Sequence, residues 1–380
     1  MFYENQPQEQ REQYKNMLRI IGKLTRLFSE SDCPYLPYRI HENIFCKYFQ
    51  AENVARSDCS ADAKKNNVGI GLKTWMGGND QKVAEFDRLR ETYSNLNGLA
   101  LVQLISQYRN ERLRITKNLY ALDSLVYHIV KRTPGKMQIL EHSFDDIDIA
   151  NIRLLNNRGL SNNTYFTDGH HTYHFSSSKN TLYMLFENMQ LLDSVNVPIL
   201  DDPYAYLTNL EIQTPVATIP TQIDTTNRIC LRLYSTKPDG TKFVYAKSGL
   251  NQWNAEGRPR NPNEIYIPFP AEDRERNVGF FPSREQPFNL KLPDGRVISA
   301  KVCQADGKAI MSNPNSVLGE WLLRNVFELP ERTLVTYEML EIYGIDSVIF
   351  TKIDDENYSV DFSELGTYER FYNLDNNTEE

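Results

Sequence analysis

Two residues flank a short apolar segment in the first quarter of the chain and could support metal-dependent chemistry. Asp62 stands before a strand expected over residues 68–75, and Lys73 lies near the end of that strand. Hydrolysis of a phosphodiester needs a divalent cation that polarises the phosphate and lowers the pKa of the attacking water, and Mg2+ prefers carboxylate oxygens. A lysine beside that water can orient it and offset developing negative charge. The pair therefore predicts a Mg2+-dependent hydrolytic site.

Three further acids could complete this site. Glu85 lies on a helix expected to begin at residue 81, and Glu42 lies on the probable helix that precedes the polar loop. Asp58 shares the loop "RSDCSAD" with Asp62 and competes with it as a metal ligand. We predict catalytic roles for Asp62, Lys73, Glu85 and Glu42, and metal binding by Asp62, Glu85 and Asp58. The same spacing also fits solvated acids and a strand-end lysine without a common role, and this alternative stays open.

These residues resemble the active site of the PD-(D/E)xK nuclease superfamily, in which an Asp at one strand edge and an (E/D)xK motif on the next strand build the site. The chain departs from this pattern at Gly71, two residues before Lys73, where the second acid would stand. In a subset of restriction endonucleases of this superfamily, the second acid lies on the succeeding helix and a small residue takes its place on the strand. The resemblance therefore implies that Glu85 is the relocated acid.

A second group of polar residues lies in the last third of the chain. Residues 248–270 read "SGLNQWNAEGRPRNPNEIYIPFP", and residues 304–315 form another polar segment just before a helix. Asn, Gln and Arg side chains make bidentate contacts with base edges in the major groove, and a Pro-stiffened loop can hold them in register. The candidate DNA-binding residues of the two segments are Asn251, Gln252, Trp253, Arg258, Arg260, Asn261, Lys308, Ser312, Asn313 and Asn315.

The ordered series "SGLNQW…GRPRNPNEIYIPFP…FFPSREQPFNLKLPDGRVISAKVCQADGKAI…NSVLGEWLLR" resembles the C-terminal domain of NgoFVII-type restriction endonucleases. That domain is a pseudobarrel related to the plant B-three DNA-binding domain and to the effector domain of EcoRII. The resemblance covers roughly residues 228–365 and implies two arms that grip the major groove, the first corresponding to residues 251–261 and the second to residues 308–315. Within the first arm, Arg258 and Arg260 would be the main base or phosphate contacts, and Arg284 would contact the DNA backbone.

The histidines give no second hydrolytic motif. A phospholipase-D-like nuclease, which NgoFVII-type enzymes carry, would need an HxK motif, but His174 is followed by a lysine only at position 179. His170, His171 and His174 could instead ligate a metal. Strand alternation, however, places the first and third on one face of a hairpin and the second on the other. We favour a surface hairpin that turns at the Asp-Gly dipeptide before these histidines.

The pattern of residues 1–210 predicts an α/β domain with a PD-(D/E)xK-like mixed sheet flanked by helices. Some segments repeat apolar residues at helical spacing, and others are short runs rich in β-favouring residues. The expected helices cover residues 9–30, 38–51, 81–93, 99–130 and 176–188, and the expected strands cover residues 68–75, 137–144, 152–158 and 163–175. A linker is expected over residues 211–227, followed by an all-β DNA-binding pseudobarrel over residues 228–370 with one helix at 317–327.

Composition and charge narrow the function classes. With 40% hydrophobic and 24% charged residues the chain is typical of globular proteins, and its net charge of −8 argues against a polycation that coats nucleic acid. Residues 228–308 nevertheless carry fourteen Lys and Arg against nine Asp and Glu, a net of +5. This local surplus favours a phosphate-binding surface, although a solvated face without a partner fits equally well.

Several other classes lack their signatures. No apolar run reaches the roughly eighteen residues of a membrane span, and the first residues lack the apolar stretch of a signal peptide, so we expect a cytoplasmic protein. Five cysteines without a CxxC pair predict reduced thiols rather than a disulfide framework or a zinc cluster. No GxxxxGK[ST] or GxGxxG loop is present, so no nucleotide cofactor is expected.

Together these features predict a type II restriction endonuclease that hydrolyses double-stranded DNA with Mg2+. A homodimer is expected, because two strands need two active sites. Two alternatives stay open. One is a modification-dependent endonuclease with a pocket for a flipped base. The other is a non-catalytic, sequence-specific DNA-binding protein in which the acids and the lysine have no common role.

Overall fold

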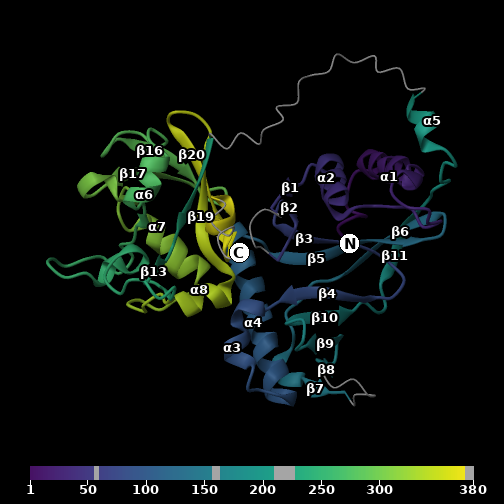
Figure 1. Ribbon diagram of the computed structural model, residues 1–380, viewed down its shortest axis with the longest axis horizontal. Coiled ribbons are helices and arrows are strands. Elements are labelled where there is room, and N and C mark those ends of the chain that lie inside the picture. The colour runs from purple at the N-terminus through teal and green to yellow at the C-terminus, as the bar shows by residue number, and fades with distance from the viewer. Residues whose placement is uncertain (55–59, 156–162, 209–226, 373–380) are drawn as a thin grey trace. The chain divides into compact units, whose positions relative to one another are not determined.

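The chain forms two compact units in the computed structural model (Figure 1). The structure describes residues 1–54, 60–155, 163–208 and 227–372. The first unit comprises the described residues of Met1–Ala55, Ser60–Leu113 and Leu122–Ala217, and the second comprises those of Arg114–Ala121 and Thr218–Glu380. Asp58 and most of the expected linker 211–227 lie outside the described residues.

The first unit contains a six-stranded mixed sheet in the order β1-β2-β3-β5-β6-β11. Its strands are β1 (Glu52–Asn53), β2 (Ala63–Lys65), β3 (Val68–Met76), β5 (Ser124–Thr133), β6 (Lys136–Ser143) and β11 (Gln190–Asn196). β3 and β5 run parallel and are connected across α4 (Gly98–Tyr120), while the other neighbours are antiparallel. The expectation of a mixed sheet with flanking helices describes this arrangement.

Two helices cover one face of this sheet (Figure 1). α1 (Gln8–Lys23) and α2 (Tyr38–Phe49) bury Leu18 and Phe45 in the same apolar core as Ile70 and Leu72 of β3. Because side chains alternate along a strand, Gly71 and the neighbouring Lys73 belong to the opposite face of β3. The strand therefore separates an apolar face from a face that carries the candidate lysine.

A second, antiparallel sheet of the first unit has the order β4-β10-β9-β8-β7. Its strands are β4 (Asp80–Glu85), β10 (Thr181–Leu185), β9 (Thr172–Ser176), β8 (Asn163–Thr167) and β7 (Arg153–Leu154). The β8–β9 pairing confirms the hairpin expected at the Asp-Gly dipeptide. The shorter helical segments described in this unit are η1 (Thr25–Leu27), η2 (Asp87–Leu89), α3 (Arg90–Tyr93), η3 (Ile149–Asn151) and α5 (Pro203–Thr208).

Three helix predictions were wrong in this unit. Residues 80–85 form strand β4 where a helix was expected, because they pair with β10 along its whole length. The expected helix at 176–188 contains strand β10, in which Leu182 and Met184 are buried on one face. This alternation of buried residues has a period of two, which is difficult to recognise in a short stretch of sequence. The long helix ends at Tyr120, ten residues before the expected end at 130, and strand β5 follows.

The second unit is a nearly closed, barrel-like sheet in the order β12-β19-β20-β16-β17-β18-β15. The strands are β12 (Arg228–Arg232), β19 (Ile345–Lys352), β20 (Asn357–Glu364), β16 (Pro287–Lys291), β17 (Val297–Cys303), β18 (Ala309–Ser312) and β15 (Ile267–Pro268). The two edge strands β12 and β15 contact each other, which nearly closes the sheet. A separate two-stranded ribbon joins β13 (Ser235–Thr236) and β14 (Lys242–Phe243). This fold fits the expected pseudobarrel.

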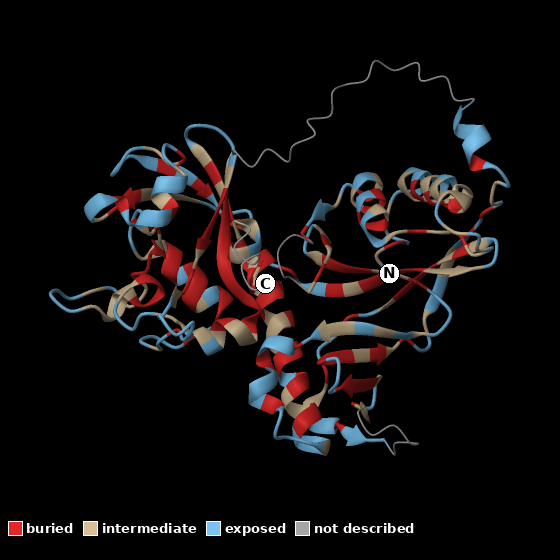
Figure 2. Ribbon diagram, in the orientation of Figure 1, coloured by how far each residue is buried: buried red, intermediate tan, exposed pale blue. Residues whose placement is uncertain are grey.

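Helices and turns fill and flank the barrel. They are η5 (Gly249–Asn254), α6 (Ala271–Arg276), η6 (Ala305–Gly307), α7 (Val317–Gly319), the π-helix η7 (Glu320–Val326), α8 (Tyr337–Tyr343) and α9 (Thr367–Phe371). Trp321, Leu322 and Val326 are buried, so the helix expected over 317–327 packs in the core as predicted (Figure 2). Residues 114–120 of α4 also belong to this unit, where Arg114 Nη1 donates to Glu328 Oε2 at 2.8 Å.

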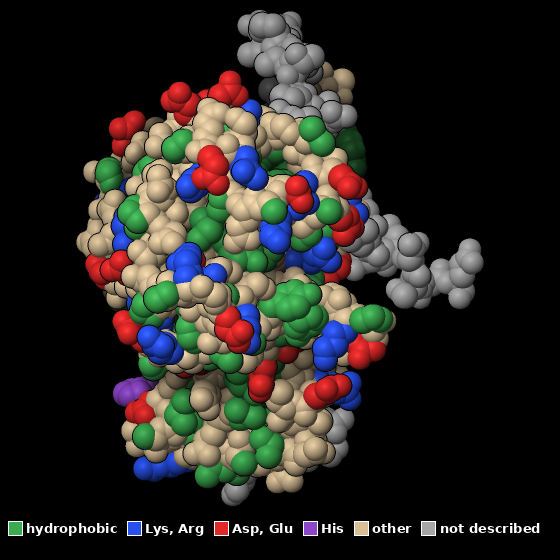
Figure 3. All heavy atoms as spheres, turned by 90° about the vertical axis from the view of Figure 1, so that its left-hand side faces the viewer, with side chains coloured by type: hydrophobic (Ala, Val, Ile, Leu, Met, Phe, Trp, Pro, Cys, Tyr) green, Lys and Arg blue, Asp and Glu red, His purple; other side chains and the backbone are tan. Residues whose placement is uncertain are grey.

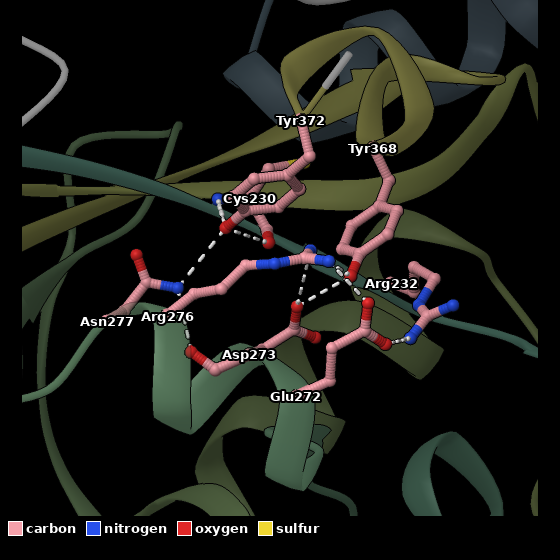
Figure 4. A network of polar contacts seen from close by, with 8 residues as sticks. All are labelled: Cys230, Arg232, Glu272, Asp273, Arg276, Asn277, Tyr368 and Tyr372. Atoms are coloured by element: carbon pink, nitrogen blue, oxygen red, sulfur yellow. Dashed lines mark hydrogen bonds and ion pairs between the residues drawn. The ribbon is translucent and has the colours of Figure 1, made fainter. Parts of the chain in front are cut away.

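A polar network fastens helices α6 and α9 to strand β12 (Figure 4). Tyr368 Oη donates to the buried Asp273 Oδ1 (2.6 Å), and the Arg232 guanidinium lies 4.3 Å from the centre of the Tyr368 ring. Tyr372 Oη donates to the carbonyl of Cys230 (3.1 Å). Burial raises the pKa of Asp273, and the hydrogen bond from Tyr368 offsets part of this increase. These contacts hold the end of the described chain on the barrel.

Among the described residues, no helix combines the length and the apolar composition that crossing a membrane would require. The four described cysteines, Cys33, Cys46, Cys230 and Cys303, are free thiols.

Gly319 marks a contact that tolerates no side chain. A Cβ at this position would lie 1.9 Å from the carbonyl oxygen of Asn263. We predict that Gly319→Ala destabilises the second unit by about 3 kcal/mol, because overpacking outweighs the roughly 1 kcal/mol that alanine gains in a helix. Calorimetric unfolding measures the change. Gly78→Ala, where no atom lies within 4 Å, is the control, and an equal effect of both substitutions would contradict the prediction.

Candidate functional site

Asp62 is anchored to strand β3 at the start of β2. Its Oδ2 accepts a hydrogen bond from the backbone N–H of Leu72 (2.6 Å), and its own N–H donates to the carbonyl of Ile70 (2.8 Å). Burial raises the pKa of Asp62, while the Leu72 N–H and the charges of Lys73 and Arg39 lower it by a smaller amount. Asp62 is thus a partly desolvated carboxylate in a fixed position, as a metal ligand requires.

Lys73 is partly buried, and the charge of Asp62 acts on it. Its Nζ donates to the carbonyl of Lys82 on β4 (3.2 Å) and lies 6.0 Å from the centre of the Tyr127 ring. Burial lowers the pKa of Lys73, the charge of Asp62 raises it, and the charge of Lys82 lowers it further. The net effect is a lowered pKa.

Glu42 on helix α2 shares the electrostatic environment of Asp62. Its side chain is buried, and Oε2 lies 3.2 Å from Arg39 Nη1. Burial raises the pKa of Glu42, the charge of Asp62 raises it further, and the Arg39 guanidinium lowers it. The charge of Asp62 thus acts on Glu42, and the charges of Asp62 and Lys73 act on each other.

Glu85 has a different setting from the one the sequence indicated. It ends strand β4 instead of lying on a helix, its side chain is exposed, and its Oε1 accepts from Lys82 Nζ at 2.6 Å. The backbone carbonyl of Glu85 accepts from Arg112 Nη1 at 2.8 Å. Glu85 therefore does not lie on a helix that would place it over strand β3.

Packing explains why position 71 carries glycine. A Cβ on Gly71 would lie 2.8 Å from Phe144 Cε1 and 2.9 Å from Tyr127 Cδ1. These two rings are stacked, with centroids 3.8 Å apart. The missing acid two residues before Lys73 is therefore a consequence of aromatic packing on that face of β3.

Asp62 and Glu42 offer carboxylate oxygens, the ligand type that a hard divalent cation prefers. The described residues contain no group of three or more His, Cys, Asp or Glu side chains that could hold a metal, and Asp58 lies outside them. Mg2+ binds typically through one or two carboxylates, completed by waters and substrate phosphates. Asp62 and Glu42 supply that number of carboxylates.

The histidine hairpin is a packed element of the second sheet. The His174 ring stacks between Tyr165 and Tyr183, with centroid distances of 4.8 and 4.6 Å, and its Nδ1 lies 3.4 Å from Asp80 Oδ1. His171 Nε2 contacts Ser143 Oγ at 3.0 Å. His170 and His171 line one pocket with His142, whereas His174 packs between the two tyrosines. The expected grouping of His170 with His174 was wrong, because strand β9 begins only at Thr172, after His170 and His171.

In the second unit, both predicted arms line one concave pocket of about 720 Å3. Predicted residues that line it are Gln252, Arg258, Arg260, Ser312, Asn313 and Asn315, and Glu264, Lys301, Cys303, Gln304, Met311 and Pro314 complete it. Asparagine, glutamine and arginine side chains from two separate chain segments thus converge on one surface.

The first arm is held by the buried carboxylate of Glu264. Arg258 Nη2 donates to Glu264 Oε1 (2.6 Å), and Arg260 Nε lies 3.4 Å from the same oxygen. Arg260 Nη1 also donates to the carbonyls of Ala255 (2.6 Å) and Glu256 (2.9 Å). Arg260 therefore closes the loop, whereas the Arg258 side chain stays 54% exposed and can reach a partner.

The second arm meets the same carboxylate. Asn315 Nδ2 donates to Glu264 Oε2 at 2.9 Å. Asn313 is exposed, and its N–H donates to the carbonyl of Ser299 (2.8 Å). Glu264 was absent from the sequence-based candidates, because a lone acid in a basic loop gives no signal of its partners; its charge among neighbouring arginines was the available hint.

Three predicted DNA contacts are less accessible than the sequence indicated. Asn251 is buried, where it donates to the carbonyl of Val335 (2.9 Å) and accepts from its N–H (2.9 Å), so it joins two loops. Ser312 is buried, and its Oγ accepts from the N–H of Leu318 (2.9 Å). Trp253 is partly buried, and its Nε1 is shielded from solvent. These side chains shape the arms from within.

The remaining predicted contacts are accessible. Arg284 and Lys308 are exposed, and Arg284 Nη1 donates to the carbonyl of Gln304 at 3.4 Å. Asn261 is also exposed, with its Oδ1 accepting from the N–H of Asn263 (2.8 Å). The face in Figure 3 carries Lys and Arg side chains interspersed with Asp and Glu rather than a continuous basic patch. The second unit contains ion pairs between such side chains, for example Lys301 with Glu285 (2.7 Å).

Comparison with known proteins characterises the second unit. Residues 224–354 match the family model for the NgoFVII C-terminal B3-like DNA-binding domain. No curated protein matches the chain. The second unit is thus similar to the DNA-binding domain of a restriction enzyme, which confirms the resemblance in its ordered motifs. The match supports sequence-specific DNA binding, with DNA as the partner.

The raised pKa of Asp62 has a consequence for stability. Because folding raises this pKa, the folded state favours the protonated form and loses stability as the pH rises through the unfolded value of about 3.9 toward the folded one. We predict that Asp62→Asn, which can still accept from the Leu72 N–H, raises Tm by about 2–4 °C at pH 7, as about 1 kcal/mol would. The gain should vanish below about pH 4.

Asp148→Asn provides a control of opposite sign for this calorimetric measurement. A hydrogen bond from Asn151 Nδ2 (2.6 Å) lowers the pKa of Asp148, so its substitution should reduce Tm at pH 7. A lower Tm for Asp62→Asn at pH 7 would contradict the prediction.

Proposed function

We propose that the protein is a site-specific endodeoxyribonuclease of the restriction type. The second unit reads a short duplex sequence, and the first unit hydrolyses DNA phosphodiesters with Mg2+. The observation that carries the proposal is the convergence of both predicted arms on one pocket, in a unit that matches a restriction-enzyme DNA-binding domain.

DNA reading rests on the side chains around this pocket. The guanidinium of Arg258 donates to Glu264 and to the Pro259 carbonyl, and its remaining N–H groups could serve guanine O6 and N7. Gln252, Asn313 and Asn315 carry the amide groups that pair with adenine. Outside the pocket, Arg284 and Lys308 are suited to phosphate contacts, which fix the register of a protein on the duplex without reading sequence.

Catalysis rests on the cluster around Asp62. Asp62 and Glu42 would hold Mg2+, which when bound polarises the scissile phosphate and lowers the pKa of coordinated water. The Leu72 N–H keeps the Asp62 carboxylate in place. Lys73, fixed by the Lys82 carbonyl, would orient the attacking water and offset negative charge on the phosphate.

We infer that Glu42 supplies the second acid in place of Glu85. Glu42 is electrostatically linked to Asp62, whereas Glu85 pairs with Lys82 at the exposed end of β4. A homodimer remains part of the proposal, because cutting two strands calls for two such sites.

A non-catalytic DNA-binding protein is the second candidate function. It is favoured by the finding that the described residues contain no group of three or more side chains that could hold a metal. The two functions predict the same behaviour of the second unit and differ only in whether bound DNA is cut.

Cleavage of unmethylated phage DNA with Mg2+ tests the catalytic assignment. We predict that Lys73→Ala and Glu42→Gln each lower the cleavage rate about 100-fold or more while DNA binding in a gel-shift assay is retained. Glu85→Gln should cut at nearly the wild-type rate. Loss of cleavage in Glu85→Gln but not in Glu42→Gln would restore the sequence-based assignment. DNA binding without cleavage in the presence of Mg2+ or Mn2+ would instead favour the non-catalytic function. Cleavage of methylated DNA but not of unmethylated DNA would indicate a modification-dependent enzyme.

Selection from randomised duplexes tests the reading of sequence. We predict that Arg258→Ala weakens the preference most strongly at one base pair, by about 10–100-fold, the 1–3 kcal/mol of a bidentate contact. Arg296→Ala removes a comparable exposed arginine, ion-paired to Asp294 at 2.7 Å, and should leave the selected sequence unchanged. Equal effects of the two variants would contradict a reading role for Arg258.

A further inference from the structure

Glu264 joins the two arms through both oxygens of one carboxylate. Oε1 accepts from Arg258 Nη2 (2.6 Å) of the first arm, and Oε2 accepts from Asn315 Nδ2 (2.9 Å) of the second. The Glu264 side chain is 2% exposed, although it contributes to the wall of the pocket. Asn315 lies 51 residues from Glu264 in the sequence, so this junction exists only in the folded unit.

Burial makes these contacts obligatory. An ionised carboxylate withdrawn from water is costly unless it is paired and hydrogen-bonded. Glu264 meets this requirement with Arg258, Arg260 and Asn315. The two guanidinium groups outweigh the single carboxylate, so the cluster keeps a net positive charge toward a phosphate-bearing ligand. The carboxylate therefore orients the arms without repelling DNA.

The geometry also limits which bases the two arms can read. Arg258 Nη2 and Asn315 Nδ2 bond to the two oxygens of one carboxylate, so their separation spans at most about two base-pair steps of roughly 3.4 Å. Arginine pairs best with guanine and asparagine with adenine in the major groove. The two side chains are thus positioned to read a guanine and an adenine that are close neighbours in the duplex.

We propose that Glu264 is a positioning residue that determines specificity. It holds Arg258 and Asn315 as one reading unit for a guanine and an adenine no more than two base-pair steps apart. The proposal rests on the proposed function of the second unit and adds the class of sequence that it reads.

Selection from randomised duplexes with the full chain provides the test. Arg258→Ala and Asn315→Ala each identify the base pair that depends on that side chain. Glu264→Gln keeps the shape of the side chain and loses its charge, and we expect it to weaken the preference at both of these base pairs together by about 10-fold, with other positions unchanged. Asp294→Asn, which removes the carboxylate partner of Arg296, is the matched control and should not alter the selected sequence.

A double-mutant cycle makes the test independent of any general loss of stability. In the wild-type background, the effects of Arg258→Ala and Asn315→Ala on affinity should be non-additive by about 3-fold or more, and in the Glu264→Gln background they should be additive. A uniform fall in affinity with unchanged base preferences, or dependent base pairs more than two steps apart, would overturn the proposal. If the wild type selects no sequence at all, the proposed reading function itself fails, which is distinguishable from a selected sequence that is indifferent to Glu264.

Discussion

A carboxylate withdrawn from water must be compensated, and both candidate sites are organised by that requirement. In the first unit, Asp62 accepts the Leu72 N–H and faces the charge of Lys73, which together offset part of the effect of burial on its pKa. In the second unit, Glu264 is matched by Arg258, Arg260 and Asn315. In the second unit this carboxylate also holds a guanidinium and an amide group from distant segments in place.

Close packing at two glycines, Gly71 and Gly319, accompanies the two candidate sites. Gly71 leaves room for the stacked Tyr127 and Phe144 rings, and this contact accounts for the absence of an acid at that position. Gly319 brings helix α7 against the backbone of Asn263, next to the loop that carries Glu264. In both places, neighbouring atoms approach the glycine so closely that no side chain fits there. The polar groups of each site lie near this contact.

The sequence predicted those parts of the fold whose signals are local. The hairpin at the Asp-Gly dipeptide, the first two helices and the core packing of Trp321 follow from turn chemistry and periodicity. Residues 80–85 and 181–185 were assigned to helices because a short segment with few β-branched residues does not show whether it forms a helix or a strand. Pairing between the two segments is what makes them strands. The misplacement of Glu85 followed directly from the first of these errors.

The sequence by itself determined the chemical groups available and the class of the second unit, because ordered motifs, residue types and charge are properties of the chain alone. Only the tertiary structure decided which groups meet. It buried Asn251 against Val335, 84 residues away, joined Glu264 to Asn315, and linked Glu42 rather than Glu85 to Asp62. These outcomes depend on contacts between distant segments and on the cost of burying charge, and neither is encoded in the spacing of residues along the chain.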